Sequence, residues 1–125
     1  MADARSPLIA LGALNAAIAV GAGAFAAHGL RDRLDARALE VFETGARYQM
    51  YHALAMILAG LITVSGATSG AKTAGWIFQA GIVLFSGSLY ALALTGVKGL
   101  GAITPLGGLA FLAGWLWFGW TAWRG

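Results

Sequence analysis

Five polar side chains near the middle of this chain could do chemistry: His28, Arg47, Tyr48, Gln49 and His52. Arg47 carries a fixed positive charge, and His52 can exchange a proton near neutral pH. Tyr48 and His52 are four residues apart and therefore share one face of a helix. This set predicts a binding site for a lipid headgroup, a quinone or an anion. Aromatic and basic residues also anchor helices at a membrane boundary, so a purely structural role stays open.

The spacing of these residues argues against a metal site. His28 and His52 are 24 positions apart, and neither belongs to an H-E-x-x-H or Glu-x-x-His pair. The chain has no cysteine, which excludes disulfides and thiolate chemistry. It also lacks a phosphate-binding G-x-x-x-x-G-K-[ST] loop and a G-x-S-x-G nucleophile motif. We therefore expect no catalytic residue, no metal site and no cofactor.

The elements that position these residues are membrane-spanning helices. Hydrophobic residues make up 59% of the chain and charged residues only 10%, which is far from the composition of a soluble protein. Four uncharged stretches, 6–30, 48–71, 73–97 and 99–123, are each longer than the roughly 20 residues that a helix needs to cross the hydrocarbon core. The sequence predicts helices at about 7–27, 47–65, 73–95 and 105–123, in a single integral membrane domain that covers 1–125.

The charged segment at about 31–45, between the first two predicted spans, has the pattern of an amphipathic helix. Leu30, Leu34, Val41 and Phe42 recur at intervals of three or four residues or their multiples, and charged side chains occupy the other face. Such a segment is typical of a helix in the headgroup plane, and Gly45 would be its hinge to the next span. The predicted fold is therefore an all-α membrane protein, a four-helix transmembrane bundle with an interfacial amphipathic helix between helices 1 and 2.

Small residues at four-residue spacing predict where the spans pack closely, since they let two helix backbones approach. These positions are Gly12, Ala16, Ala17, Gly21, Ala110 and Gly114. Asn15 lies at the middle of the first span and should find a hydrogen-bond partner across the bundle.

The net charge of +3 comes from basic residues beside the spans, where membrane lipids are nearer partners than nucleic acid. The first and third loops hold five Lys and Arg, against three in the termini and the second loop. Since cytoplasmic loops are enriched in Lys and Arg, this bias predicts that the first and third loops are cytoplasmic and both termini are outside.

Two motifs carry a resemblance to a known family. They are GAFAAHGL at 23–30 and VFETGARYQMYHALA at 41–55. These segments resemble a family of small polytopic membrane proteins of unknown function that includes bacterial YgdD and YwdK and eukaryotic transmembrane protein 256. The resemblance implies, in bacteria, a protein of the cytoplasmic (inner) membrane, and it transfers no catalytic residue.

Three functional hypotheses follow from the sequence. The first is an accessory or interaction subunit that packs against other membrane proteins or self-associates. The second is a small module that binds or passes a lipid headgroup, quinone or solute at a site near His28 and His52. The third, an enzyme, has the least support, because no paired acid and base stands in a recognisable motif.

Overall fold

The computed structural model describes residues 5–125, and all regular structure in this range is helical. The helices are α1 (Pro7–Ala27), α2 (Ala36–Ser65), α3 (Ala71–Thr95) and α4 (Thr104–Arg124), with a short 3₁₀ helix, η1 (Lys98–Ala102), before α4. Four helices are long and apolar enough to cross a membrane, as the sequence predicts.

Local chemistry sets where these helices begin and end. Asp35 caps α2 by accepting a hydrogen bond of 2.7 Å from the backbone N–H of Ala38, as its position predicts. Ser6 caps α1 in the same way, and Pro7 follows it in the first turn. Gly66 and Gly96 end α2 and α3 with φ of 74° and 72°, a left-handed conformation that favours glycine.

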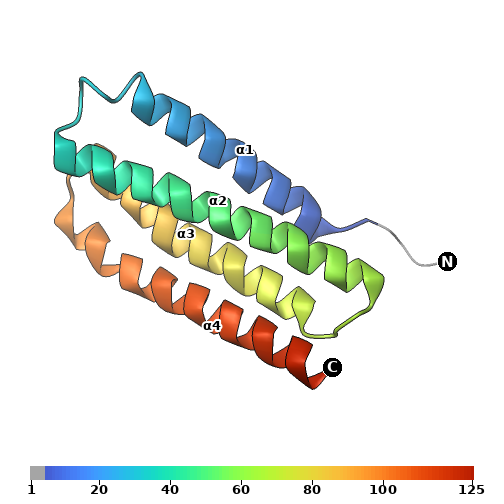
Figure 1. The fold of residues 1–125 in the computed structure, drawn as a ribbon. Helices are drawn as coiled ribbons and strands as arrows, with labels where there is room; N and C mark the ends of the chain where they lie inside the picture. Colours follow the sequence, from blue (N-terminus) through green and yellow to red (C-terminus); the bar gives the residue numbers. More distant parts are fainter. Residues whose placement is uncertain (1–4) are drawn as a thin grey trace.

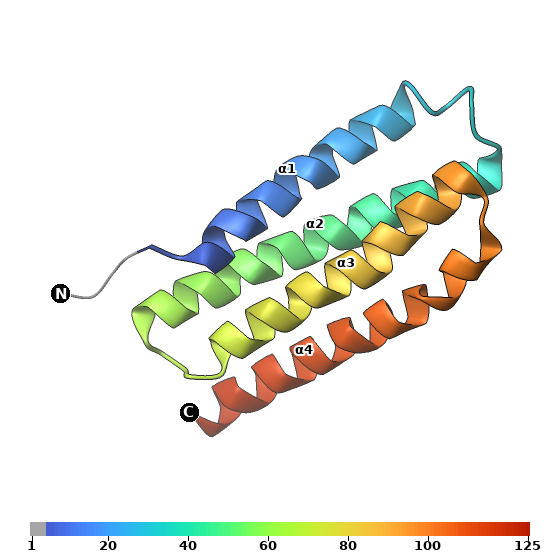
Figure 2. The same ribbon diagram turned by 180° about the vertical axis from the view of Figure 1, so that it is seen from behind.

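The four helices form an antiparallel row in which each packs on its neighbours in the chain (Figure 1). Extensive contacts join α1 with α2, α2 with α3, and α3 with α4. Seen from both sides, α1 and α4 are the two edges of the row (Figure 2). The predicted four helices are therefore arranged as a row, in which side chains also join α2 to α4.

The predicted break at Gly45 is absent, because α2 is one continuous helix of 30 residues. The apolar face of residues 36–45 packs on α1 and α3: Phe42 contacts the ring of Phe25, with centroids 6.3 Å apart, and the ring of Tyr90 at 4.8 Å. Gly45 is a close-packing position, since an added Cβ would lie 3.0 Å from the Tyr90 ring. The separate interfacial amphipathic helix at 31–45 is thus not present; most of that segment is the first part of a span.

Only some of the predicted small-residue positions lie at helix contacts. A Cβ on Gly12 would lie 2.8 Å from the carbonyl oxygen of Ala53, and one on Gly114 would lie 2.7 Å from the Phe78 ring. Their companions Ala16 and Ala110 are half-buried. Ala17 and Gly21 instead lie on the exposed side of α1, and nothing stands within 4 Å of a Cβ on Gly21.

Candidate functional site

A chain of hydrogen-bonded side chains crosses the middle of the helix row. The Nε2 of Gln49 donates to Asn15 Oδ1 at 2.9 Å, and Asn15 Nδ2 donates to Gln79 Oε1 at 2.8 Å and to the Leu11 carbonyl at 2.9 Å. The Tyr90 hydroxyl donates to Gln49 Oε1 at 2.7 Å. The prediction that Asn15 finds a hydrogen-bond partner across the helices is thus confirmed. The network joins α1, α2 and α3, and most polar side-chain atoms of its members are hydrogen-bonded.

His52 is buried at a similar depth, between α2 and α4. Its Nδ1 lies 2.8 Å from the carbonyl oxygen of Tyr48, and its Nε2 lies 3.0 Å from the indole Nε1 of Trp115. A carbonyl only accepts and an indole N–H only donates, so the ring is neutral with its proton on Nδ1. The imidazole also stacks on the Phe111 ring, with centroids 3.5 Å apart. Both ring nitrogens therefore have hydrogen-bond partners. The contacts of His52 with Trp115 and Phe111 join α2 to α4.

A groove of about 490 Å³ lies beside this histidine, between α2 and α4. Its lining is mostly aromatic and consists of Tyr48, Tyr51, His52, Phe85, Gly108, Phe111, Leu112 and Trp115. No charged side chain lines it. Such a surface suits an apolar chain or ring and offers no charge for an anion.

Trp115→Phe should lower stability by about 1 kcal/mol, because it leaves Nε2 of His52 without its donor while keeping most of the ring packing. Thermal unfolding in a mild detergent would measure the change. Trp117→Phe is the matched control, since Trp117 is exposed on the same helix and the hydrogen bond to His52 comes from Trp115. Equal losses for the two variants would contradict this role of Trp115.

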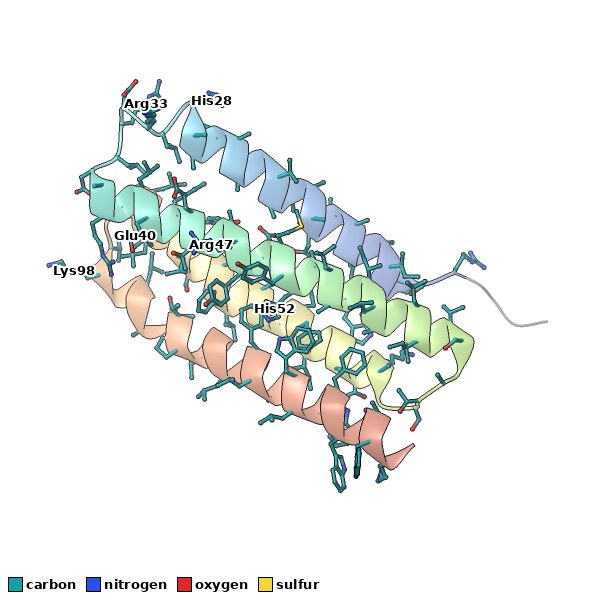
Figure 3. The ribbon with its side chains drawn as sticks, viewed as in Figure 1. His28, Arg33, Glu40, Arg47, His52 and Lys98 are labelled. Carbon is teal, nitrogen blue, oxygen red and sulfur yellow. The ribbon has the colours of Figure 1, made fainter. Side chains whose placement is uncertain are left out.

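The structure does not bring the five predicted site residues together (Figure 3). His28 is exposed just beyond the end of α1, whereas His52 lies within the helix row. Gln49 is buried in the amide network, and Arg47 is exposed on the outer side of α2. Only Tyr48 and His52 share a groove. No single pocket is lined by both histidines in the pockets found along residues 5–125.

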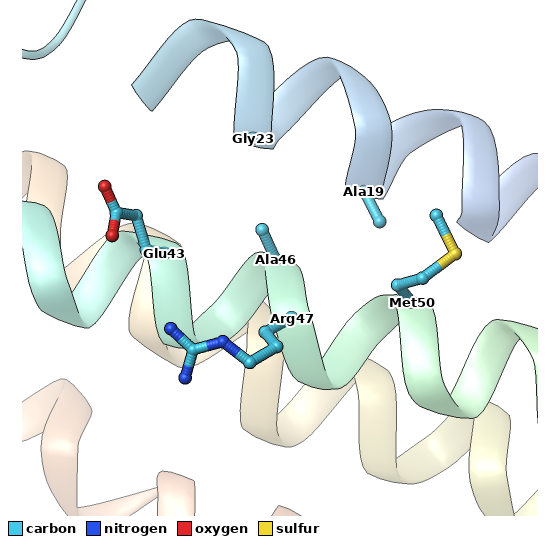
Figure 4. Close-up of a pocket in the computed structure, with 6 residues that line it drawn as sticks. All are labelled: Ala19, Gly23, Glu43, Ala46, Arg47 and Met50. Carbon is cyan, nitrogen blue, oxygen red and sulfur yellow. The ribbon is translucent and has the colours of Figure 1, made fainter. Parts of the chain in front are cut away.

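Arg47 and Glu43 line a second groove, of about 360 Å³, between α1 and α2 (Figure 4). On α1 the groove is bounded by Ala19 and Gly23, which follow the helix midpoint at Ala17 by two and six residues. At about 1.5 Å per residue, Ala19 and Gly23 lie roughly 3–9 Å along the helix axis from the middle of α1. The sequence predicts Arg47 at the membrane boundary, and that position stays a prediction.

These two charges have no ion-pair partner among the residues that the structure describes. The ion pair in this part of α2 joins Arg37 Nη1 and Glu40 Oε1, which lie 3.8 Å apart. Arg47 extends along α2 toward the end that carries Glu43, without coming within 4.0 Å of that carboxylate (Figure 4). A charged side chain near the middle of a bilayer costs about 2.5–3.5 kcal/mol on the insertion scale.

Within residues 5–125, no group of three or more His, Cys, Asp or Glu side chains is placed to hold a metal ion.

Comparison with known proteins identifies a family whose function is not known. A family model described as "Protein of unknown function (DUF423)" matches residues 22–108. A "UPF0382 membrane protein" of Staphylococcus epidermidis is 57% identical over 109 residues, which cover 86% of this chain and 88% of that protein. The "UPF0382 membrane protein YwdK" of Bacillus subtilis is 53% identical over 110 residues, or 86% of this chain and 89% of that protein. No solved structure matches this chain.

Proposed function

We propose an interaction function for this chain, which belongs to the DUF423 family of proteins of unknown function. The resemblance inferred from the motifs at 23–30 and 41–55 is confirmed, and the relatives are bacterial membrane proteins. In this proposal the protein is an accessory subunit that docks another membrane polypeptide against the outer face of α2. Membrane lipids surround the rest of the helix row.

The observation that carries this proposal is that Glu43 and Arg47 lie within α2 and have no ion-pair partner in the described part of the chain. Both are exposed on α2, and with Ala19 and Gly23 of α1 they line a groove near the middle of that helix. Charged residues inside a membrane usually face another protein element or a water-filled cavity, and they pair there. A docked polypeptide that carries opposite charges would remove the cost of exposing this face to hydrocarbon.

The geometry favours docking over ligand binding near His28 and His52. A binding module would need polar groups that converge on one ligand, whereas His52 has both nitrogens engaged and His28 lies elsewhere. The side chains of the amide network also form their hydrogen bonds with one another and not toward a shared ligand position. Glu43 and Arg47, by contrast, line a groove and have no ion-pair partner in the described part of the chain.

We place the protein in the cytoplasmic membrane, with the first and third loops inside and both termini outside. The support is the positive-inside tendency: Arg31, Arg33, Arg37 and Lys98 lie at one end of the row, and Arg5, Lys72 and Arg124 lie at the other.

A photo-crosslinking amino acid would test the docking face in native membranes. Tyr51 is 51% exposed on the outer side of α2, so its replacement by benzoylphenylalanine keeps an aromatic ring in place. We expect a crosslinked polypeptide from position 51 and little from Val83, an exposed control position on α3. Lipid adducts alone at both positions would contradict the docking function.

A further inference from the structure

We propose that a groove at the end of the row where α1 begins binds the phosphate group of an anionic phospholipid, with Arg5 and Lys72 as its cations. The groove has a volume of about 510 Å³ and lies among the start of α1, the last turn of α2 and the first two turns of α3. Figures 1 and 2 both show these three helix ends at the same end of the row. The inference concerns a different surface from the docking face of α2 and does not depend on the docking function.

The charged side chains that line this groove are both basic. Arg5 precedes α1 and Lys72 lies in the first turn of α3, and no Asp or Glu is part of the lining. The groove on the outer face of α2 has one charge of each sign, and the aromatic groove between α2 and α4 has none. At the opposite end of the row, a groove with Arg37 and Lys98 also contains Asp35. Of these four grooves, the one at the start of α1 therefore offers an anion the most favourable lining.

The hydrogen-bonding groups of the groove suit a phosphate, whose oxygens accept hydrogen bonds from cationic donors. Arg5 already makes an interaction within the chain, but a guanidinium has five N–H donors, so others remain for a second acceptor. The Ser6 hydroxyl accepts from the Ile9 N–H at 3.2 Å, which leaves its own hydrogen to donate. Thr63 adds no donor, because its hydroxyl donates to the Ala59 carbonyl at 2.7 Å.

Close packing of three helices fixes the shape of the groove. A Cβ on Gly60 of α2 would lie 2.9 Å from the Ser6 hydroxyl oxygen, and a Cβ on Gly75 of α3 would lie 2.6 Å from the Leu8 side chain. Leu8 itself is 3% exposed. The start of α1 is therefore held against both neighbouring helices, and the groove is formed before any ligand arrives.

The apolar part of the lining favours a phospholipid over a free phosphate ion. Pro7, Leu8, Val64 and Trp76 complete the groove with Thr63. Trp76 is 40% exposed, and tryptophan side chains are enriched where hydrocarbon meets the headgroups. All three helices are long enough to cross a membrane, so their ends are expected at the level of the lipid phosphates. A lipid contacts these side chains with its glycerol and acyl chains, whereas an inorganic phosphate gains nothing from them.

Native mass spectrometry of the full-length chain in detergent tests this site by titration with phosphatidylglycerol or with phosphatidylcholine. We expect one phosphatidylglycerol to bind more tightly than phosphatidylcholine, because only the first lipid has a net negative charge. Arg5→Gln and Lys72→Gln should each weaken its binding by about tenfold, since each removes one charge-assisted contact. Lys72→Arg should bind as the wild type does. Arg124→Gln is the matched control, because it removes an exposed positive charge at the same end of the row and outside the groove.

Three results would overturn the site. Equal binding of the two lipids would remove the role of the negative charge, and an equal loss in Arg124→Gln would reduce the effect to the overall charge of the protein. Inorganic phosphate that displaced phosphatidylglycerol at a similar concentration would show that the groove takes the free ion and not a lipid. Arg5 and Lys72 are exposed, so both glutamine variants should unfold at the wild-type temperature without added lipid, which separates loss of binding from loss of fold.

Discussion

Gly107→Ala should destabilise the protein by about 2 kcal/mol, the largest effect that we expect from adding one methyl group. A Cβ at position 107 would clash with the backbone nitrogen of Phe85 and lie 2.7 Å from its Cα. Backbone atoms in the middle of α3 cannot move aside as a flexible side chain can, so α4 would have to separate from α3. Thermal unfolding in detergent would record the change, at about 4 °C for each kcal/mol in a chain of this size.

The neighbouring glycine is the control for this prediction. A Cβ on Gly108 would meet only the Phe85 ring, at 3.9 Å, which is an ordinary van der Waals distance. Gly108→Ala should therefore be neutral or stabilising, since alanine is favoured over glycine in a helix by up to about 1 kcal/mol. Equal losses from both substitutions would contradict the close approach of α3 and α4 at Gly107.

Gln49→Leu should cost about 1–3 kcal/mol, because it removes two hydrogen bonds from the middle of the helix row. The Tyr90 hydroxyl loses its acceptor, and Asn15 Oδ1 loses its donor, in surroundings without water to replace them. The amide is 4% exposed, so leucine occupies a comparable volume in the same packed site. Thermal unfolding in lipid nanodiscs is the appropriate measurement.

A double-mutant cycle separates this effect from simple repacking. Asn15→Leu combined with Gln49→Leu should cost less than the sum of the two single changes, because the pair removes both members of one hydrogen bond. Additive losses would show that the 2.9 Å contact contributes little to stability. Gln79→Leu should be milder than Gln49→Leu, since Gln79 accepts from Asn15 alone in the described network.

The sequence predicts the helices well because their signals are local. Uncharged length marks four spans, Asp35 provides a cap, and Gly66 and Gly96 mark two helix ends. The packing of the first part of α2 depends on contacts with distant parts of the chain. This part carries charges that favour the headgroup region, but its apolar face packs on α1 and α3 and continues into the rest of α2. The structure therefore joins residues 36–46 and the predicted span from 47 in one continuous helix.

The earlier start of α2, at Ala36, explains why the candidate site was only partly predicted. With α2 beginning at 47, His28 and His52 would both lie near one membrane surface; with α2 beginning at Ala36, His52 lies deep in the row. Small-residue spacing had a similar limit, because it marks Gly12 and Gly21 equally while only Gly12 meets a neighbouring helix. Gln79 had a detectable signal, as the one side-chain amide in the uncharged stretch 73–97.

The order of the helix row also bears on how the protein is made. Because each helix packs on the one before it, every newly synthesised segment meets a partner that is already in the membrane. Asn15 would enter the bilayer with its amide only partly paired, and α2 brings Gln49 to it as soon as the first hairpin closes. The network is complete only when α3 brings Gln79 to Asn15 and Tyr90 to Gln49, and α4 then adds the contact of Trp115 with His52.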